Sequence, residues 1–359
     1  MTITEENGTP QWRLWDAGDL DRWKVEPLKW SVNPIIPQGT VGFMSGQPKL
    51  GKSLMALDLC IHITHAHLEE THWLGRFRCN PGNILYIARE DPARRIKERG
   101  VEILKSYGWD FVLPEALTFL IRERFNLLKK EHLDWLAEQV EKLEIDFLIL
   151  DVFNRMIPDL DENSARDMGA AVDVIEELNR AYNLTILMLD HTRKPAVDQN
   201  QIQAPNPFEL RGSTAKYGCA DFMICIGRTN QDGRLQVYCE NKDTDQCPNF
   251  LVDVSPKGST DPKFRWAGDV QQLTEDRKSV GKHNRKRVLE AVRESESTGS
   301  SRHKICAKTG LSPSTVGSHL AILREFGAIK QVGDNKKTLY VAATDRPGAS
   351  LRPSDSVKA

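Results

Sequence analysis

Eight consecutive residues have the types and spacing that bind a triphosphate. They match the pattern Gly-x-x-x-x-Gly-Lys-Ser/Thr in full and are Gly46, Gln47, Pro48, Lys49, Leu50, Gly51, Lys52 and Ser53. Glycines let the backbone bend so that successive N–H groups point toward phosphates, and the dipole of a following helix favours the bound anion. We expect Lys52 to reach the β- and γ-phosphates of ATP and the hydroxyl of Ser53 to bind Mg²⁺.

Acidic residues follow two apolar runs farther along the chain. Asp151 ends the run 147–150, where its carboxylate can hold the shell of the Mg²⁺ ion. Glu90 follows the run 84–88, where a base that polarises the attacking water is needed. Asp91 is the competing candidate, although the alternative role of a helix-capping acid suits Asp91 better than Glu90. We therefore assign Asp151 to the metal and Glu90 to the base.

Two further side chains are candidates for contact with ATP, one as a sensor of the γ-phosphate and one as a finger from a neighbouring subunit. His191 comes just after the apolar run 184–189 and can contact the γ-phosphate region, although a lone histidine more often has a structural role. Arg211 follows a stretch rich in Gln, Asn and Pro at residues 195–207 and can project toward the ATP of a neighbouring subunit. Such trans-acting arginines contribute roughly 10³–10⁵ in rate. The alternative for Arg211 is a solvated surface arginine.

The elements that must position these residues alternate between short apolar runs and helical stretches from Thr40 onward. Strands that are apolar on both faces and are joined by crossover helices predict an α/β fold with a mostly parallel sheet, that of a P-loop NTPase. The predicted strands are 41–44, 84–88, 117–121, 147–150 and 184–189, and the predicted helices are 53–66, 92–107, 131–143 and 165–182. Residues 222–226, 235–240 and 250–254 are expected to complete the sheet as antiparallel strands.

Taken in order, these motifs resemble the RepA-type branch of the RecA-fold ATPases, whose best-known member is a hexameric helicase of plasmid replication. The resemblance covers roughly residues 28–255 and is carried by residues 46–53, Glu90, Asp151, residues 161–168, 191–194 and 211–213. It implies a RecA-like fold, a homo-hexameric ring with ATP between subunits, and the roles given above for Lys52, Ser53, Glu90, Asp151, His191 and Arg211. The chain departs from the family at Asp190, where a second histidine is often found.

The C-terminal part of the chain is basic, whereas the remainder is acidic. Residues 277–359 contain 17 lysines and arginines against 7 aspartates and glutamates, a net charge of +10, and residues 1–276 have a net charge of −11. This asymmetry indicates a polyanionic partner. A basic disordered tail would carry the same charge and is the alternative.

Residues 285–344 have the pattern of a winged helix-turn-helix. Helices are predicted at 287–294, at 302–309 and from Ser312 onward, and strands at 328–332 and 338–341 are expected to form the wing. The third helix has apolar residues on one face, which leaves the other face free to enter the major groove of DNA. The expected DNA contacts are Ser314, Thr315, Ser318 and His319 on this helix and Lys336 and Lys337 in the wing. A helical bundle that contacts protein is the alternative.

We expect the chain to divide into an N-terminal arm at 1–38, an ATPase domain at 39–270, a linker at 271–284, the winged-helix domain at 285–344 and a disordered tail at 345–359. The first residues show no signal-peptide pattern, and the apolar runs are too short to cross a membrane. The seven cysteines form no CxxC pair and have no zinc-site spacing. We therefore expect a cytoplasmic protein with no membrane partner.

Three functions fit these features. The first is an ATP-driven DNA motor, such as a helicase or replication ATPase of a plasmid, phage or mobile element. The second is an ATP-dependent switch that does not move along DNA, either a DNA-binding regulator or a protein that assists recombination or transposition. The third is a structural DNA-binding protein with an inactive ATPase, which the presence of Lys52, Glu90 and Asp151 argues against.

Overall fold

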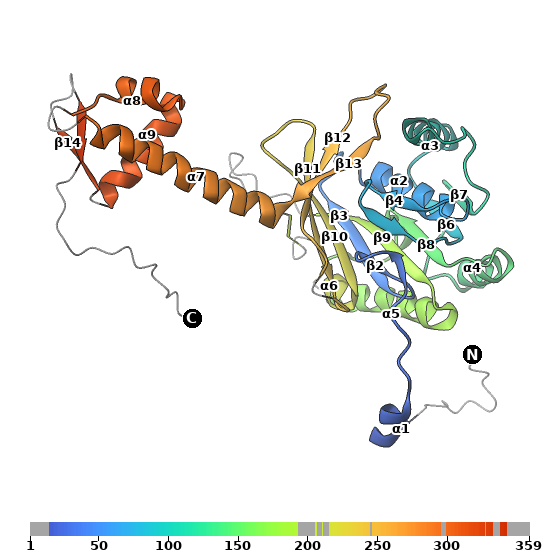
Figure 1. The fold of residues 1–359 in the computed structure, drawn as a ribbon. Coiled ribbons are helices and arrows are strands. Elements are labelled where there is room, and N and C mark those ends of the chain that lie inside the picture. The colour runs from blue at the N-terminus through green and yellow to red at the C-terminus, as the bar shows by residue number, and fades with distance from the viewer. Residues whose placement is uncertain are drawn as a thin grey trace. The chain divides into compact units, whose positions relative to one another are not determined.

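The chain forms two compact units, Met1–Val270 and Gln271–Ala359 (Figure 1). The computed structural model describes residues 14–192, 205–206, 210, 215–244, 246–295, 299–326, 328–332 and 338–342. Each unit has its own apolar core, so each is treated by itself.

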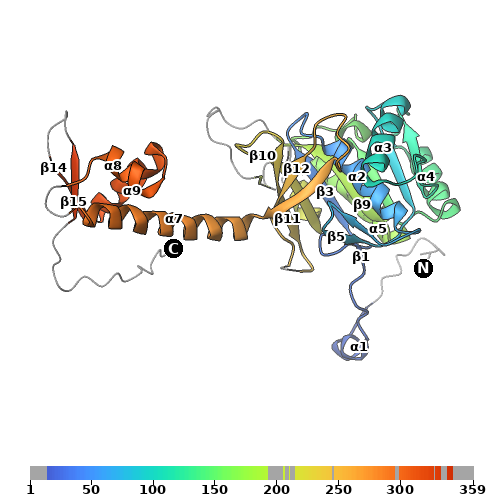
Figure 2. The ribbon, with the colours of Figure 1, turned by 45° about the horizontal axis from the view of Figure 1, so that its top comes forward.

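A nine-stranded sheet forms the centre of the first unit (Figures 1 and 2). Its order is β13-β12-β11-β10-β3-β9-β8-β6-β7, in which the strands from β10 to β7 are parallel neighbours and β11, β12 and β13 are antiparallel. The bounds are β3 Val41–Gly46, β6 Ile84–Ala88, β7 Leu117–Ile121, β8 Phe147–Asp151, β9 Thr185–His191, β10 Phe222–Arg228, β11 Arg234–Asn241, β12 Phe250–Val254 and β13 Phe264–Asp269. The predicted α/β fold with a mostly parallel sheet is confirmed.

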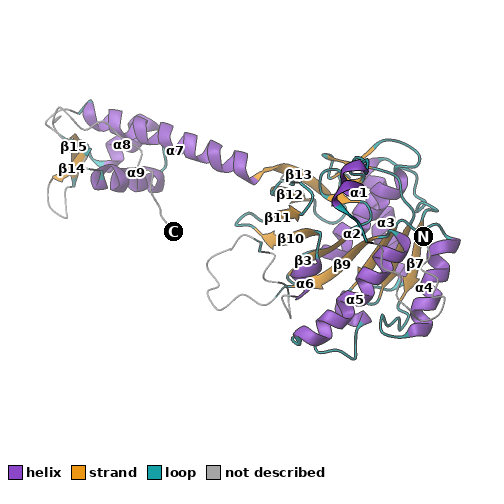
Figure 3. Cartoon of the chain, turned by 90° about the horizontal axis from the view of Figure 1, so that it is seen from below, coloured by secondary structure: helices purple, strands orange, loops and turns teal. Residues whose placement is uncertain are grey.

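Helices cover both faces of this sheet, which is why β3, β6 and β8 are buried along their whole length. Helices α2 (Lys52–His65) and α3 (Ala93–Tyr107) pack with one face. Helices α4 (Lys130–Lys142), α5 (Ala165–Tyr182) and the short α6 (Ala215–Cys219) lie on the other face, which is turned toward the viewer in Figure 3. A 3₁₀ helix, η1 (Phe153–Met156), follows β8.

A small antiparallel sheet of order β2-β1-β5-β4 adds to the first unit. Its strands are β1 Trp30–Val32, β2 Ile36–Pro37, β4 Thr71–Trp73 and β5 Phe77–Cys79. Residues 30–37 belong to the predicted arm, yet the structure places them in this sheet because Val32, Ile35 and Ile36 are fully buried. Before them comes the short helix α1 (Ala17–Arg22), which has no buried residue.

The second unit consists of α7 (Val270–Arg293, beginning at the boundary), α8 (Arg302–Thr309), α9 (Pro313–Glu325) and a hairpin of β14 (Ile329–Val332) and β15 (Leu339–Ala342). Ser312 caps α9, and its hydroxyl accepts a hydrogen bond from the Thr315 amide at 3.2 Å. Val316, Leu320 and Leu323 are buried in the core of this unit, as predicted. The winged helix-turn-helix is confirmed, and the predicted linker, residues 271–284, lies within α7.

Membrane-spanning helices are absent from the part of the chain that the structure describes, because no helix there is both long enough and apolar enough.

Candidate ATP-binding site

The phosphate loop, residues Gly46–Ser53, joins the carboxyl end of β3 to the first turn of α2. Two of its residues have left-handed backbone conformations, Lys49 with φ 66° and Gly51 with φ 87°. Glycine adopts such a conformation without steric cost, which explains Gly51 at the start of α2. A Cβ atom on Gly46 would lie 2.7 Å from the carbonyl oxygen of Ile226 on the neighbouring strand. Gly51 therefore allows the tight turn, Gly46 allows the close approach of β10, and the N-terminus of α2 is the end of a helix that favours anions.

Lys52 lies at the centre of the loop and is buried. Its Nζ donates to the carbonyl oxygens of Gly46 at 2.8 Å and Gln47 at 3.1 Å, and it contacts Nδ1 of His191 at 3.1 Å. Burial lowers the pKa of Lys52 to about 8, against the opposing influence of nearby carboxylates, first among them Asp151. At neutral pH the side chain is therefore mostly an ammonium, the form that attracts phosphates.

Ser53 and Asp151 lie side by side, as expected for a Mg²⁺ site. The Ser53 hydroxyl donates to Oδ1 of Asp151 at 3.2 Å, and the Tyr86 hydroxyl donates to Oδ2 at 2.6 Å. Burial raises the pKa of Asp151 to about 6, so it is a carboxylate at neutral pH. Among the described residues no group of three or more His, Cys, Asp or Glu side chains could hold a metal alone. A hydroxyl and one carboxylate fit Mg²⁺, which keeps several waters and takes phosphate oxygens as its other ligands.

Glu90 and Asp91 differ sharply in their surroundings. Asp91 accepts hydrogen bonds from Arg95 at 2.6 Å and from Arg99, and its side chain is only 16% exposed. Glu90 is 52% exposed and has one ion pair, from Nε of Arg155 to its Oε1 at 3.3 Å. Two guanidinium groups therefore hold Asp91 in place, whereas Glu90 stays accessible to a water molecule.

Asp190, the position at which the chain departs from the family that it resembles, forms a buried ion pair. Its Oδ2 lies 2.7 Å from Nζ of Lys216, and both side chains are fully buried. Its Oδ1 accepts from Asn154 at 3.0 Å and from the backbone amide of His191 at 2.7 Å. Burial raises the pKa of Asp190, and the neighbouring Lys216 opposes this rise. The pair fixes the backbone at His191 and so positions the ring that contacts Lys52.

A cavity of about 320 Å³ opens beside the start of α2. It is lined by Leu54, by one side of α3 and by the segment between β12 and β13, namely residues 256–261 and Lys263. Phe264, the next residue, lies 3.7 Å from where a Cβ of Gly51 would be. The cavity therefore adjoins the first turn of α2, next to the phosphate loop.

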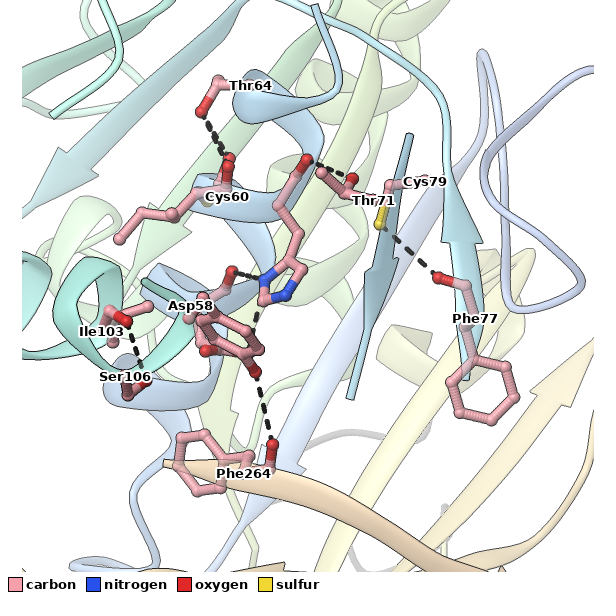
Figure 4. Close-up of polar contacts among 12 residues, drawn as sticks. Asp58, Cys60, Thr64, Thr71, Phe77, Cys79, Ile103, Ser106 and Phe264 are labelled. Carbon is pink, nitrogen blue, oxygen red and sulfur yellow. Dashed lines mark hydrogen bonds and ion pairs between the residues drawn. The ribbon is translucent and has the colours of Figure 1, made fainter. Parts of the chain in front are cut away.

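A group of buried polar side chains supports α2 behind the phosphate loop (Figure 4). Asp58 of α2 is fully buried, and its pKa is raised well above the ordinary value by that burial. Burial lowers the pKa of His62, one turn farther on, to about 4. The Tyr107 hydroxyl of α3 donates to the carbonyl oxygen of Phe264 at 3.4 Å. The rise in the pKa of Asp58 and the fall in the pKa of His62 both favour the uncharged forms, which lowers the cost of burying this group between α2, α3 and β13.

The structure brings Lys52, Ser53, Asp151 and His191 together. Arg211, Lys336 and Lys337 lie outside the described residues. On α9, Ser314 and Ser318 are exposed, whereas Thr315 and His319 are half-buried. Nδ1 of His319 is buried with no hydrogen-bond partner in the described part of the chain.

Three residues of the site were not found from the sequence: Tyr86, Asn154 and Lys216. Tyr86 lies within the apolar run of a strand, and Lys216 follows the Arg-Gly-Ser-Thr motif. Neither pattern distinguishes these two residues from ordinary core and surface residues.

Two protein-family models match the chain. The model described as "AAA domain" matches residues 7–197, and the model described as "Bacterial regulatory protein, arsR family" matches residues 282–331. No curated protein matches.

Solved structures with a similar fold include a KaiC-like protein from Pyrococcus horikoshii OT3. It has 12% identity and a TM-score of 0.46, and the match covers 67% of this chain and 100% of that one. A second is an ATPase domain with 10% identity and a TM-score of 0.45, covering 60% of this chain and 82% of that one.

Proposed function

Since this chain belongs to the AAA domain family, we propose that it is an ATP-hydrolysing DNA motor, a RepA-like helicase or replication ATPase of a plasmid, phage or mobile element. The observation that carries the ATPase proposal is the convergence of Lys52, Ser53 and Asp151 at one end of the parallel sheet. Ligands bind at this edge of open α/β sheets, beyond the carboxyl ends of the strands.

In the proposed mechanism, backbone amides of the phosphate loop and the Lys52 ammonium bind the β- and γ-phosphates. Ser53 and Asp151 would hold Mg²⁺, which would neutralise charge on the phosphate oxygens. Glu90 accepts a proton from the attacking water, whose oxygen forms the new bond to phosphorus while the bond to ADP breaks. His191 would contact the γ-phosphate region and sense whether the γ-phosphate is present.

Oligomerisation completes the site in this proposal. Arg211 would reach the ATP of a neighbouring subunit in a homo-hexameric ring and stabilise the charge that develops in the transition state.

The winged helix would bind DNA through Ser314, Thr315, Ser318 and His319 on α9 and through Lys336 and Lys337. The match of residues 282–331 to a regulatory-protein family favours one alternative, an ATP-dependent DNA-binding regulator or recombination helper that does not translocate.

All seven cysteines are free thiols, which supports a cytoplasmic location.

Replacing Lys52 tests the proposal directly. We expect Lys52→Ala to lower ATP hydrolysis by at least ~100-fold, because a preorganised positive charge on the phosphates is removed. The measurement is phosphate release with Mg²⁺, with Lys142→Ala on the exposed end of α4 as the control. Hydrolysis at the wild-type rate in Lys52→Ala would exclude this site as the ATPase centre.

Unwinding separates the motor from the regulator. A motor unwinds a forked duplex with ATP and loses this activity in Lys52→Ala. If the wild type hydrolyses ATP without unwinding the duplex or moving along a strand, the motor is excluded and the ATP-dependent regulator remains as the function.

The wing is tested through the salt dependence of duplex binding. We expect Lys336→Gln/Lys337→Gln to reduce the slope of log K against log salt concentration by about 1.8, since each phosphate contact on duplex DNA contributes about 0.9. Fluorescence anisotropy with a labelled duplex at several salt concentrations gives this slope. A slope equal to that of the wild type would exclude the two lysines as phosphate contacts.

A further inference from the structure

Four arginines lie on three neighbouring segments of the first unit, just after the carboxyl ends of β6, β7 and β8. Arg89 follows β6, Arg122 and Arg124 follow β7, and Arg155 lies in η1 after β8. The Arg89 guanidinium donates to the carbonyl oxygen of Glu123 and, at 3.4 Å, to that of Arg155. The Arg122 amide donates to the carbonyl oxygen of Ala88 at 2.7 Å. We call these four residues the arginine cluster.

The cluster has an excess of positive charge, because four arginines have two acids near them, Glu90 and Glu123. Burial lowers the pKa of Arg89, and the charges of Arg155 and Arg124 lower it further, with Glu123 as the opposing acid. Arg122, Arg124 and Arg155 are exposed. Within the described part of the chain, Arg155 has an ion pair with Glu90, whereas no side-chain partner is seen for Arg122 or Arg124. An excess of like charge at a surface raises the local concentration of ions of the opposite sign, so this surface attracts anions.

We propose that the arginine cluster binds the phosphodiester backbone of single-stranded nucleic acid. This inference rests on the proposed function in one respect, that nucleic acid is the partner. The planar fork of a guanidinium matches the oxygens of a phosphate, which favours phosphates over other anions.

A single strand suits the cluster better than a duplex. Positive grooves that follow a flexible backbone are the common feature of single-strand binding. The cluster is a local concentration of arginines in a region, residues 1–276, whose net charge is −11. Its members follow three parallel strands, so they lie at the sheet edge that also holds the nucleotide site.

Arg155 connects the cluster to catalysis, because its guanidinium is 3.3 Å from the carboxylate of Glu90. A phosphate that binds Arg155 competes with Glu90 for this guanidinium. The Glu90 carboxylate, which is accessible to water in either case, then has no competing ion pair when it contacts the attacking water. Single-stranded nucleic acid is therefore expected to stimulate hydrolysis through this pair.

The test uses the full chain carrying Arg122→Gly and Arg124→Gln. Glycine suits position 122, because Arg122 has a φ of 58° that most side chains disfavour. Each phosphate contact on a single strand contributes about 0.7 to the salt slope, so we expect the slope for labelled oligothymidylate to fall by about 1.4. The slope for duplex DNA, assigned to the winged helix, is expected to stay at the wild-type value.

The matched control is Lys142→Gln/Arg180→Gln, which also removes two exposed positive charges. These residues lie in the last turns of α4 and α5, which lead into the amino ends of β8 and β9 and so lie away from the carboxyl ends that carry the cluster. This variant is expected to retain the wild-type salt slope for oligothymidylate. If the double variant of the cluster unfolds at a much lower temperature than the wild type, Arg124→Gln alone replaces it in the test. Its salt slope for oligothymidylate is expected to fall by about 0.7.

Unchanged oligothymidylate slopes in both cluster variants would overturn the inference and leave an acidic protein as the remaining kind of partner. Binding of a fluorescent ATP analogue is measured in parallel with Mg²⁺. Failure of that binding in the wild type would instead contradict the proposed function, so the two failures are distinguishable.

Discussion

Glu90→Gln is expected to reduce ATP turnover by roughly 10²–10⁴-fold, the usual contribution of a general base. The amide has nearly the shape of the carboxylate but cannot accept a proton. ATP affinity should be retained, because the phosphates are bound by the loop and Lys52. Single-turnover hydrolysis and binding of a fluorescent ATP analogue measure the two quantities separately.

Asp91→Asn is the comparison that decides between the two neighbouring acids. Asp91 binds the guanidinium groups of Arg95 and Arg99, so its replacement should affect the start of α3 more than the chemical step. We expect a smaller loss of turnover than in Glu90→Gln, together with a lower melting temperature. If Asp91→Asn has the larger effect on turnover and Glu90→Gln is nearly normal, the base is Asp91.

The strands of the central sheet could be predicted because each is an uninterrupted apolar run bounded by polar residues. Residues 84–88 and 117–121 are strands with the predicted bounds. Strand β13 and the small sheet of β1, β2, β4 and β5 were missed. Those strands are two to six residues long, and β13 has only one fully buried side chain, Phe264. Such segments are too short, or too little buried, for a periodic pattern of apolar residues to distinguish them from loops.

The phosphate end of the site could be predicted because its chemistry requires a fixed spacing of neighbouring residues. Lys52 and Ser53 belong to one such motif, and Asp151 follows an apolar strand. Lys216 could not be found in this way, since its partner Asp190 is 26 residues earlier in the chain and only the fold brings them together. A lysine is usually exposed, so its complete burial here follows from tertiary structure alone.

Lys216→Met is expected to destabilise the first unit by about 3–5 kcal/mol, because the carboxylate of Asp190 would stay buried without its cation. For a domain of this size the melting temperature should fall by roughly 6–20 °C. Hydrolysis should fall as well, since Asp190 holds the backbone amide of His191 at 2.7 Å. Thermal unfolding followed by circular dichroism measures the stability.

Two variants identify the unpaired charge as the cause. Lys216→Met/Asp190→Asn leaves no buried charge, and an asparagine can still accept from His191 and Asn154, so we expect it to recover much of the lost stability. Lys242→Met breaks an ion pair with Asp221 in which the lysine side chain is 55% exposed, and it should cost less than about 1 kcal/mol. If the double variant is as unstable as Lys216→Met, the loss of stability comes from packing around the aliphatic stem of Lys216, whose Nζ lies over the ring of Phe153. In that case the ion pair is not what holds His191 in place.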